Sequence, residues 1–147
     1  MNDSQDEFVD GPAATAKILN SMPESRRRTL LSKMIAKDPQ VLNRIGSLLI
    51  SFSDISYLDN RGAQILIKES DHYTLVTALK YADDKVFDVL LSNMTERKRM
   101  IVVEDLKTTA HFPREQVEEA QRAIVQKLDE LRTKGIVRLS KPDDIWV

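Results

Sequence analysis

The chain has 147 residues, of which 41% are hydrophobic, a size that suits one domain or two small lobes with buried cores. Its 22 Lys and Arg residues against 23 Asp and Glu residues give a net charge of -1, which argues against broad, phosphate-driven binding to nucleic acid. Without Cys there are no disulfides and no thiolate chemistry, and two His residues are too few for a convincing metal site. No apolar run approaches the roughly 20 residues that cross a bilayer, and the N-terminus lacks the pattern of a signal peptide, so we expect a cytoplasmic protein.

The first ten residues are polar and acidic, and we expect residues 1–10 to form a disordered tail. Pro12 suits a first helical turn, so a short helix should start there and end where Ser21 to Pro23 interrupts it. A second helix is predicted from Glu24 to Asp38-Pro39, and a third helix should follow. Their apolar positions are Ala13, Ala16, Ile18, Leu19, Met22, Leu30, Leu31, Met34, Ile35, Val41, Leu42, Ile45, Leu48 and Leu49. These three helices could pack as one small lobe, residues 11–49.

Serines separate apolar residues over residues 50–58, a pattern compatible with a strand or with an irregular connector, and we favour a connector. Three short helices should follow. The first is capped by Asp59 or Asn60 and runs through Lys68, and the second is capped by Ser70 or Asp71 and runs through Lys80. The third begins at Asp83 or Asp84 and ends near Ser92. These helices open a second lobe, residues 59–147.

A charged helix is predicted from Asn93 to Lys107, with cations clustered in its first half and two acids in its second. Arg97 and Glu104 are seven residues apart, close to two helical turns, so both should project from the same side. Met94, Ile101, Val102 and Leu106 can turn toward a core. Taken alone, the charges are best explained as a solvated face, although they also suit a contact surface that offers both signs of charge to a partner.

A longer helix is predicted from Pro113 to about Lys134, and Gly135 should end it. Its apolar positions Val117, Ala120, Ile124, Leu128 and Leu131 form a single stripe. Beyond it, residues 136–139 and 145–147 flank a turn-like Lys-Pro-Asp-Asp segment and could form a short C-terminal hairpin. The sequence therefore predicts an all-α fold of two helical lobes with this hairpin at its end.

The candidate catalytic residues do not form a recognisable site. The neighbouring acids in Glu104-Asp105 and Glu118-Glu119 diverge by about 100° on a helix, so each pair is better explained as a solvated face than as an acid and base on one substrate. His72 and His111 lack a nucleophile-elbow context, and the four glycines are too scattered to form a phosphate loop. We expect no catalytic residue, no cofactor and no metal.

Nucleic-acid binding is a minority interpretation. The last helix, Gly135 and the predicted hairpin resemble the end of a winged-helix domain, but much of the polar face of that helix is acidic. The compact basic runs are Arg26-Arg27-Arg28 and Arg97-Lys98-Arg99, and short runs of this kind on helices are usually solvated and partly paired.

Several short motifs occur in a characteristic order. They are Phe52-Ser53-Asp54-Ile55, Leu58-Asp59-Asn60-Arg61-Gly62-Ala63-Gln64, Ala78-Leu79-Lys80, Leu91-Ser92-Asn93-Met94-Thr95-Glu96-Arg97, Glu104-Asp105-Leu106, Val117-Glu118-Glu119-Ala120-Gln121 and Gly135-Ile136-Val137. In order and spacing they resemble the C-terminal domain of the flagellar motor switch protein FliG, and the resemblance covers nearly the whole chain from Gly11.

The resemblance implies an armadillo-like helical lobe from Pro12 to about Leu49, joined by a hinge to a six-helix lobe that bears the torque surface. The hinge residues would be Leu49, Ile50, Ser51 and Phe52. The charges that match the family's stator-contacting ridge are Lys80, Arg97, Glu104 and Asp105. Implied partners are the cytoplasmic loop of a MotA-type stator, FliM-type switch proteins and neighbouring rotor subunits, at the cytoplasmic face of the flagellar basal body.

This chain departs from the family pattern at three places. The family usually reads Gly-Pro-Val-Arg before its last long helix, and that Arg completes the ridge, whereas this chain has Ala110-His111-Phe112-Pro113. The contribution of the Arg would be lost or displaced to Arg114, one place later. The hinge usually reads Met-Phe-x-Phe, and here the two leading residues differ. Tyr81 replaces a Gly that usually follows the Lys, so the helix end at Lys80 could be shaped differently.

The family's N-terminal and middle domains have no counterpart in this sequence. We therefore expect either a fragment or a stand-alone relative that joins or modifies a switch complex. Our leading hypothesis is a non-enzymatic rotor component whose charged helix contacts the stator to generate torque and set the direction of rotation. A second hypothesis is a helical scaffold or regulatory adaptor without a role in torque.

Overall fold

The structure is a computed structural model, and it describes residues 11–109 and 111–141. Helices dominate this part of the chain and confirm the predicted all-α fold class. The predicted tail, residues 1–10, and the second half of the predicted hairpin, residues 145–147, lie outside the described residues. Within them no strand forms, and a single antiparallel bridge joins Leu58 to Leu139.

Three helices follow one another at the N-terminal end: α2 (Gly11–Asn20), α3 (Glu24–Lys37) and α4 (Val41–Ile45), the last extended by the 3-10 helix η1 (Gly46–Leu48). They enclose a small apolar cluster whose buried members are Leu19, Val41 and Ile45. Partly buried apolar side chains pack around it, namely Met22, Leu31, Met34, Ile35 and Leu49. Ile18 and Leu30, although they fit the helical pattern, lie on the outer faces of α2 and α3.

The segment that could have been a strand or a connector contains the 3-10 helix η2 (Phe52–Tyr57). The connector interpretation is correct in that no strand forms, but the segment is regular rather than irregular. Phe52, Ile55 and Leu58 are buried in a second, larger apolar cluster. Burial of these side chains explains why the segment is ordered.

The next three helices, α5 (Asn60–Glu69), α6 (His72–Leu79) and α7 (Asp84–Ser92), follow the prediction closely. Each is capped by the aspartate that precedes it: Asp59 accepts a hydrogen bond from the Gly62 N–H (2.7 Å), Asp71 from the Thr74 N–H (3.1 Å) and Asp83 from the Val86 N–H (2.9 Å). An aspartate in this position satisfies a backbone N–H that the first helical turn leaves free.

Helices α8 (Glu96–Thr108) and α9 (Arg114–Thr133) complete the described chain. The predicted stripe of α9 is buried along its whole length. Gly135 has φ of 76°, and the Ile136 N–H donates to the Leu131 carbonyl (2.9 Å) just after the helix. Gly135 ends α9 as predicted, because glycine adopts this left-handed conformation without a side-chain clash.

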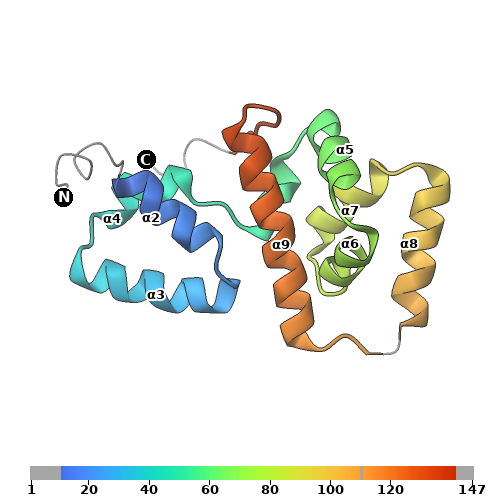
Figure 1. Cartoon of the computed structure of the whole chain (residues 1–147), viewed down its shortest axis with the longest axis horizontal. Helices are drawn as coiled ribbons and strands as arrows, with labels where there is room; N and C mark the ends of the chain where they lie inside the picture. The colour runs from blue at the N-terminus through green and yellow to red at the C-terminus, as the bar shows by residue number, and fades with distance from the viewer. Residues whose placement is uncertain (1–10, 110, 142–147) are drawn as a thin grey trace, which may run out of the picture.

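Helix α9 runs through the middle of the molecule, with α2, α3 and α4 on one side and α5 to α8 on the other (Figure 1). The larger apolar cluster gathers side chains from η2 and α5 to α9, which are six helices within the described residues. Helix α8 lies at the outer edge of this group (Figure 1). Its outward face is therefore available to another protein.

Candidate functional site

The charged helix begins later than predicted. Asn93 caps the end of α7, where its side-chain Nδ2 donates to the Val89 carbonyl (2.8 Å), and Met94 is buried in the turn that follows. Thr95 is the N-cap of α8, and its hydroxyl accepts a hydrogen bond from the Lys98 N–H (3.1 Å). The predicted start at Asn93 is wrong because Asn93 completes the previous helix, and Thr95 then caps the new one.

Arg99 fastens the start of α8 to the end of α7. Its Nε–H donates to the Leu91 carbonyl (2.9 Å), and its Nη2 donates to the Met94 carbonyl (3.2 Å). These carbonyls lie at the end of α7 and in the turn that follows, where helical hydrogen bonding stops, and the Leu91 carbonyl also accepts from the Met94 N–H (3.2 Å). Arg99, expected to be part of a solvated basic run, therefore fixes the orientation of α8.

Arg97 and Glu104, a cation and an anion of α8, lie on the outer face of this helix. Arg97 and Glu104 are both exposed, and an α-helix turns by nearly two full turns between them. Val102 is completely buried, and Leu106 packs partly against the large cluster, so the opposite face holds the helix in place. Ile101, predicted to face the core, is 45% exposed instead and lies beside the two charges.

Asp105 lies about 100° around the helix from Glu104 and has a partner within the chain. Its Oδ2 is 2.8 Å from the Nε2 atom of His72, at the start of α6. Both side chains are partly exposed, so the contact sits at the rim between α6 and α8. No hydroxyl of the described residues is hydrogen-bonded to His72, and the pair therefore lacks the nucleophile of a catalytic triad.

Lys80 is the C-cap of α6 and lies over an aromatic ring. Its Nζ is 5.3 Å from the ring centroid of Phe112, a buried residue in the linker between α8 and α9. This is a cation–π distance. Tyr81, which stands where the family usually has Gly, does not require a left-handed backbone, because no described residue other than glycine has positive φ.

Arg114 occupies the first position of α9, directly after Pro113. Its side chain is 90% exposed, and its Nε lies 3.6 Å from Glu118 on the next turn. The structure thus places Arg97 and Glu104 together on α8, Asp105 beside His72, Lys80 above Phe112, and Arg114 on α9. These five charges come from three helices, and among the described residues Asp105, Lys80 and Arg114 have side-chain partners whereas Arg97 and Glu104 have none.

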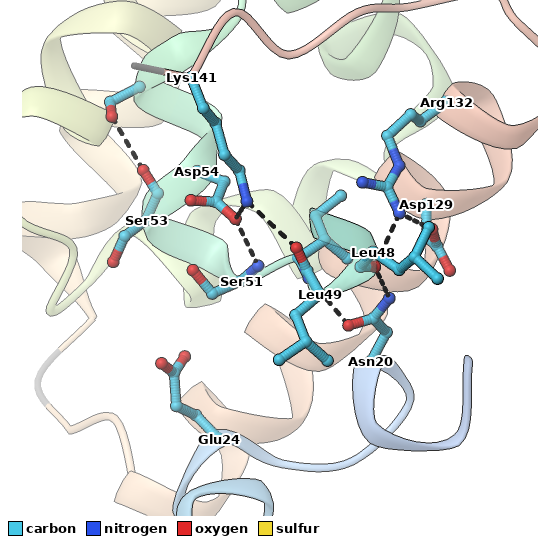
Figure 2. Close-up of polar contacts among 12 residues, drawn as sticks. Asn20, Glu24, Leu48, Leu49, Ser51, Ser53, Asp54, Asp129, Arg132 and Lys141 are labelled. Carbon is cyan, nitrogen blue, oxygen red and sulfur yellow. Dashed lines mark hydrogen bonds and ion pairs between the residues drawn. The ribbon is translucent and has the colours of Figure 1, made fainter. Parts of the chain in front are cut away.

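Side chains from α2, α9 and the C-terminal segment contact the backbone of the predicted hinge, Leu49 to Phe52, and of Leu48 just before it (Figure 2). The Leu48 carbonyl accepts hydrogen bonds from Asn20 Nδ2 (3.0 Å) and from Arg132 Nη2 (3.0 Å). The Leu49 carbonyl accepts a hydrogen bond from Lys141 Nζ (3.1 Å). These contacts join α2, α9 and the C-terminal segment at one stretch of backbone.

Asn20 and Arg27 make the next contacts along this stretch, and both are buried. The Asn20 Oδ1 atom accepts hydrogen bonds from the Ile50 N–H (2.9 Å) and from Arg27 Nη1 (3.2 Å), and Arg27 also donates to the Ile50 carbonyl. Burial lowers the pKa of the Arg27 guanidinium, and the nearby carboxylates of Glu24 and Asp54 act in the opposite direction. The expectation of a solvated Arg26-Arg27-Arg28 run is wrong for its middle member, which is buried and bonds to Asn20 and the Ile50 carbonyl.

Lys141 also forms an ion pair with Asp54 beside the predicted hinge. Lys141 Nζ is 2.9 Å from Asp54 Oδ2, and the two side chains are only 17% and 14% exposed. The same Asp54 oxygen accepts a hydrogen bond from the Ser51 N–H (2.9 Å) (Figure 2). Hinge backbone groups from Leu48 to Ser51 therefore have specific partners.

Sequence reasoning did not single out His72, Asn20, Arg27 or Lys141 as contact residues. Asn20 gave one usable signal, because it follows Leu19 near the apolar face of a predicted helix, where a polar residue needs a partner. His72 and Lys141 depend on contacts between segments far apart in sequence, and Arg27 depends on contacts to the preceding helix and to Ile50, which no helical pattern reveals.

The remaining acidic pair of the sequence also has partners. Glu118 accepts a hydrogen bond from Ser25 Oγ (3.2 Å) and pairs with Arg114, while Glu119 pairs with Arg122. In the part of the chain that the structure describes, no three acidic or histidine side chains are grouped so that they could hold a metal ion. No described helix is long and apolar enough to cross a membrane.

A family model described as the FliG C-terminal domain matches residues 32–139, more than half of the chain. The flagellar motor switch protein FliG of Bacillus subtilis is 29% identical over 139 residues, covering 93% of this chain and 41% of that protein. The FliG of Thermotoga maritima is 26% identical over 133 residues, covering 90% of this chain and 40% of that protein. The chain thus spans about two fifths of the length of these curated relatives.

Solved structures give the same result. A crystal structure of Helicobacter pylori FliG, residues 86–343, superposes with a TM-score of 0.69 at 27% identity, covering 92% of this chain and 65% of that one. The structure of full-length FliG from Aquifex aeolicus superposes with a TM-score of 0.59 at 28% identity, covering 86% of this chain and 40% of that one. Sequence and fold agree on one family.

Proposed function

We propose, since this chain belongs to the FliG C-terminal domain family, that it is a non-enzymatic component of a flagellar rotor whose helix α8 contacts the stator to generate torque and set the direction of rotation. The observation that supports this function best is the pair Arg97 and Glu104. Both are exposed on one side of a capped helix, and neither has an ion-pair partner in the described chain. Lys80, Asp105 and Arg114 would complete the charged ridge.

Weak contacts suit this task. An exposed ion pair contributes only about 0.2 to 1 kcal/mol, so a face with one cation and one anion can engage a partner and release it quickly. Opposite charges at fixed positions also make the contact directional, because a partner in the wrong register meets like charges. The caps and Arg99 hold α8 rigid while it transmits force.

The partner would be the cytoplasmic loop of a MotA-type stator. FliM-type switch proteins and neighbouring rotor subunits would be further partners, and the site of action would be the cytoplasmic face of the flagellar basal body. The support for these assignments is the family membership together with the charged outer face of α8.

The two helical lobes would be joined at Leu48 to Ser51, and this joint would allow one lobe to rotate relative to the other. Leu49 packs against the small apolar cluster, whereas Ile50 and Phe52 are buried in the large one, so the boundary between the cores falls between Leu49 and Ile50. This supports a joint narrower than residues 50–58, since η2 packs with the large cluster. Rotation there would require the hydrogen bonds of Asn20, Arg132 or Lys141 to break.

Charge reversal on α8 tests the function. Arg97→Asp, Glu104→Lys and the double variant would be introduced into the chromosomal gene of the source organism, and swimming speed would be measured. Each single reversal turns an attraction into a repulsion of similar size, so we expect a partial loss of speed, with a larger loss in the double variant.

Arg138→Asp and Asp88→Lys are matched controls. Both residues are exposed, lie outside α8 and form no ion pair in the described chain. They should leave speed unchanged. Parent-like swimming of all three α8 variants would contradict the torque assignment and favour an adaptor role.

A further inference from the structure

The charges of the proposed ridge are not equally free to meet a partner. Asp105 is occupied by His72, Lys80 lies over Phe112, and Arg114 pairs with Glu118. Arg97 and Glu104 are the members of the ridge for which the described structure shows no side-chain partner. A partner that docks on α8 would therefore meet these two charges first.

Two large apolar side chains lie between these charges. Met100 is 66% exposed, and Ile101 is 45% exposed. They follow Arg97 by three and four residues and precede Glu104 by four and three, which places all four on neighbouring positions of one helix face. Single exposed apolar residues are ordinary on protein surfaces, but two adjacent ones enclosed by opposite charges form the composition of a contact centre with a polar rim.

We propose that Arg97, Met100, Ile101 and Glu104 form one docking surface, and that its occupant is a partner helix carrying an acidic, an apolar and a basic side chain in the same order. The acid would lie against Arg97, the apolar side chain against Met100 and Ile101, and the base against Glu104. Charge complementarity fixes the register, and burial of the apolar pair supplies affinity that two exposed ion pairs cannot give. The inference rests on the proposed function and names the chemistry of the partner segment.

Polar replacement of the apolar pair tests this surface. The double variant Met100→Gln/Ile101→Gln keeps the helix-forming tendency and all charges but removes the apolar centre. Introduced into the chromosomal gene, it should lower swimming speed at least twofold. The variant Met100→Leu/Ile101→Leu should retain parent speed, because leucine preserves the apolar surface. Ile18→Gln is the matched control, since Ile18 is 61% exposed on α2, and it should have no effect.

The charge variants distinguish the proposed function from the inference about Met100 and Ile101. If Arg97→Asp and Glu104→Lys slow swimming while the double glutamine variant does not, the surface is purely electrostatic and the inference is wrong, although the proposed function stands. If none of them slows swimming, the proposed function fails. A loss of speed in Met100→Leu/Ile101→Leu equal to that of the glutamine variant would also overturn the inference. Circular dichroism and thermal melting of the purified chain should match the parent for each variant, since all these side chains are exposed.

Discussion

At the scale of single residues, contacts within the chain decide which charges a partner can reach. His72 and Asp105 illustrate this, because the family pattern marks Asp105 as a ridge acid while the structure pairs it with a histidine 33 positions earlier. The sequence predicted the acid but not its partner. The local pattern around a lone histidine says nothing about which helix it will touch.

Removal of His72 should release Asp105 for the partner. We expect His72→Ala to restore part of the swimming speed lost in Glu104→Lys, because Asp105 then supplies a nearby acid. The measurement is a double-mutant comparison of swimming speed for the parent, each single variant and the pair. Strictly additive effects would show that Asp105 does not contribute to the docking face.

Two surface carboxylates, Asp38 and Glu119, contribute to the dependence of stability on pH. The hydrogen bond from Arg44 lowers the pKa of Asp38, with help from the Gln40 N–H, and the hydrogen bond from Arg122 lowers the pKa of Glu119. A carboxyl whose pKa is lower in the folded state contributes stability above its unfolded pKa, about 4, and this stability is lost as the pH falls through the folded value.

We therefore expect the thermal midpoint of the parent chain to fall between about pH 4 and pH 2 more steeply than that of Asp38→Asn/Glu119→Gln. Thermal unfolding followed by circular dichroism in this range checks the difference. Both groups are exposed, so the effect should be small. Identical pH profiles would show that these hydrogen bonds do not persist in solution.

At the scale of elements, the helix starts could be predicted well because caps are local. Asp59, Asp71 and Asp83 each bond to a backbone N–H three residues later, a pattern visible in the sequence. The start of α8 was predicted too early, because Asn93 is the C-cap of α7 and Thr95 is the N-cap of α8. Arg99 also donates to the Leu91 and Met94 carbonyls, and these contacts cannot be predicted from a local pattern.

The buried side-chain amide of Asn20 links α2 to the backbone around the predicted hinge. Asn20 bonds to the Leu48 carbonyl, the Ile50 N–H and Arg27. Asn20→Ala leaves the buried Ile50 N–H without an acceptor and removes one of the hydrogen bonds of the Leu48 carbonyl and of Arg27, so we expect it to lower the free energy of unfolding by about 1 to 3 kcal/mol. Urea unfolding of the purified chain measures this.

Asn43→Ala provides the comparison. Asn43 is exposed on α4, and its replacement should change the free energy of unfolding by no more than about 0.5 kcal/mol. Equal effects of the two replacements would mean that the Asn20 hydrogen bonds do not stabilise the hinge.

At the scale of the whole molecule, the amphipathic stripe of α9 determined the arrangement. Five apolar positions predicted from sequence spacing are buried, and α9 lies between the two groups of helices (Figure 1). The polar contacts across these groups could not be predicted. Arg122 donates to the Ser21 carbonyl (3.1 Å) and Arg132 to the Leu48 carbonyl, over separations of 101 and 84 residues. Contacts between residues so far apart in sequence leave no periodic pattern. The sequence therefore predicts the helices but not the hydrogen bonds that hold α2, α3 and α4 against α9.

The central claim is that the outer face of α8 transmits force through Arg97 and Glu104. The most direct measurement is the torque of single motors, read from the rotation of beads attached to flagellar filaments in cells that carry Arg97→Asp/Glu104→Lys. We expect a lower torque in Arg97→Asp/Glu104→Lys than in the parent, and the same torque as the parent in Arg138→Asp and Asp88→Lys. Parent torque in the α8 double variant would contradict the central claim.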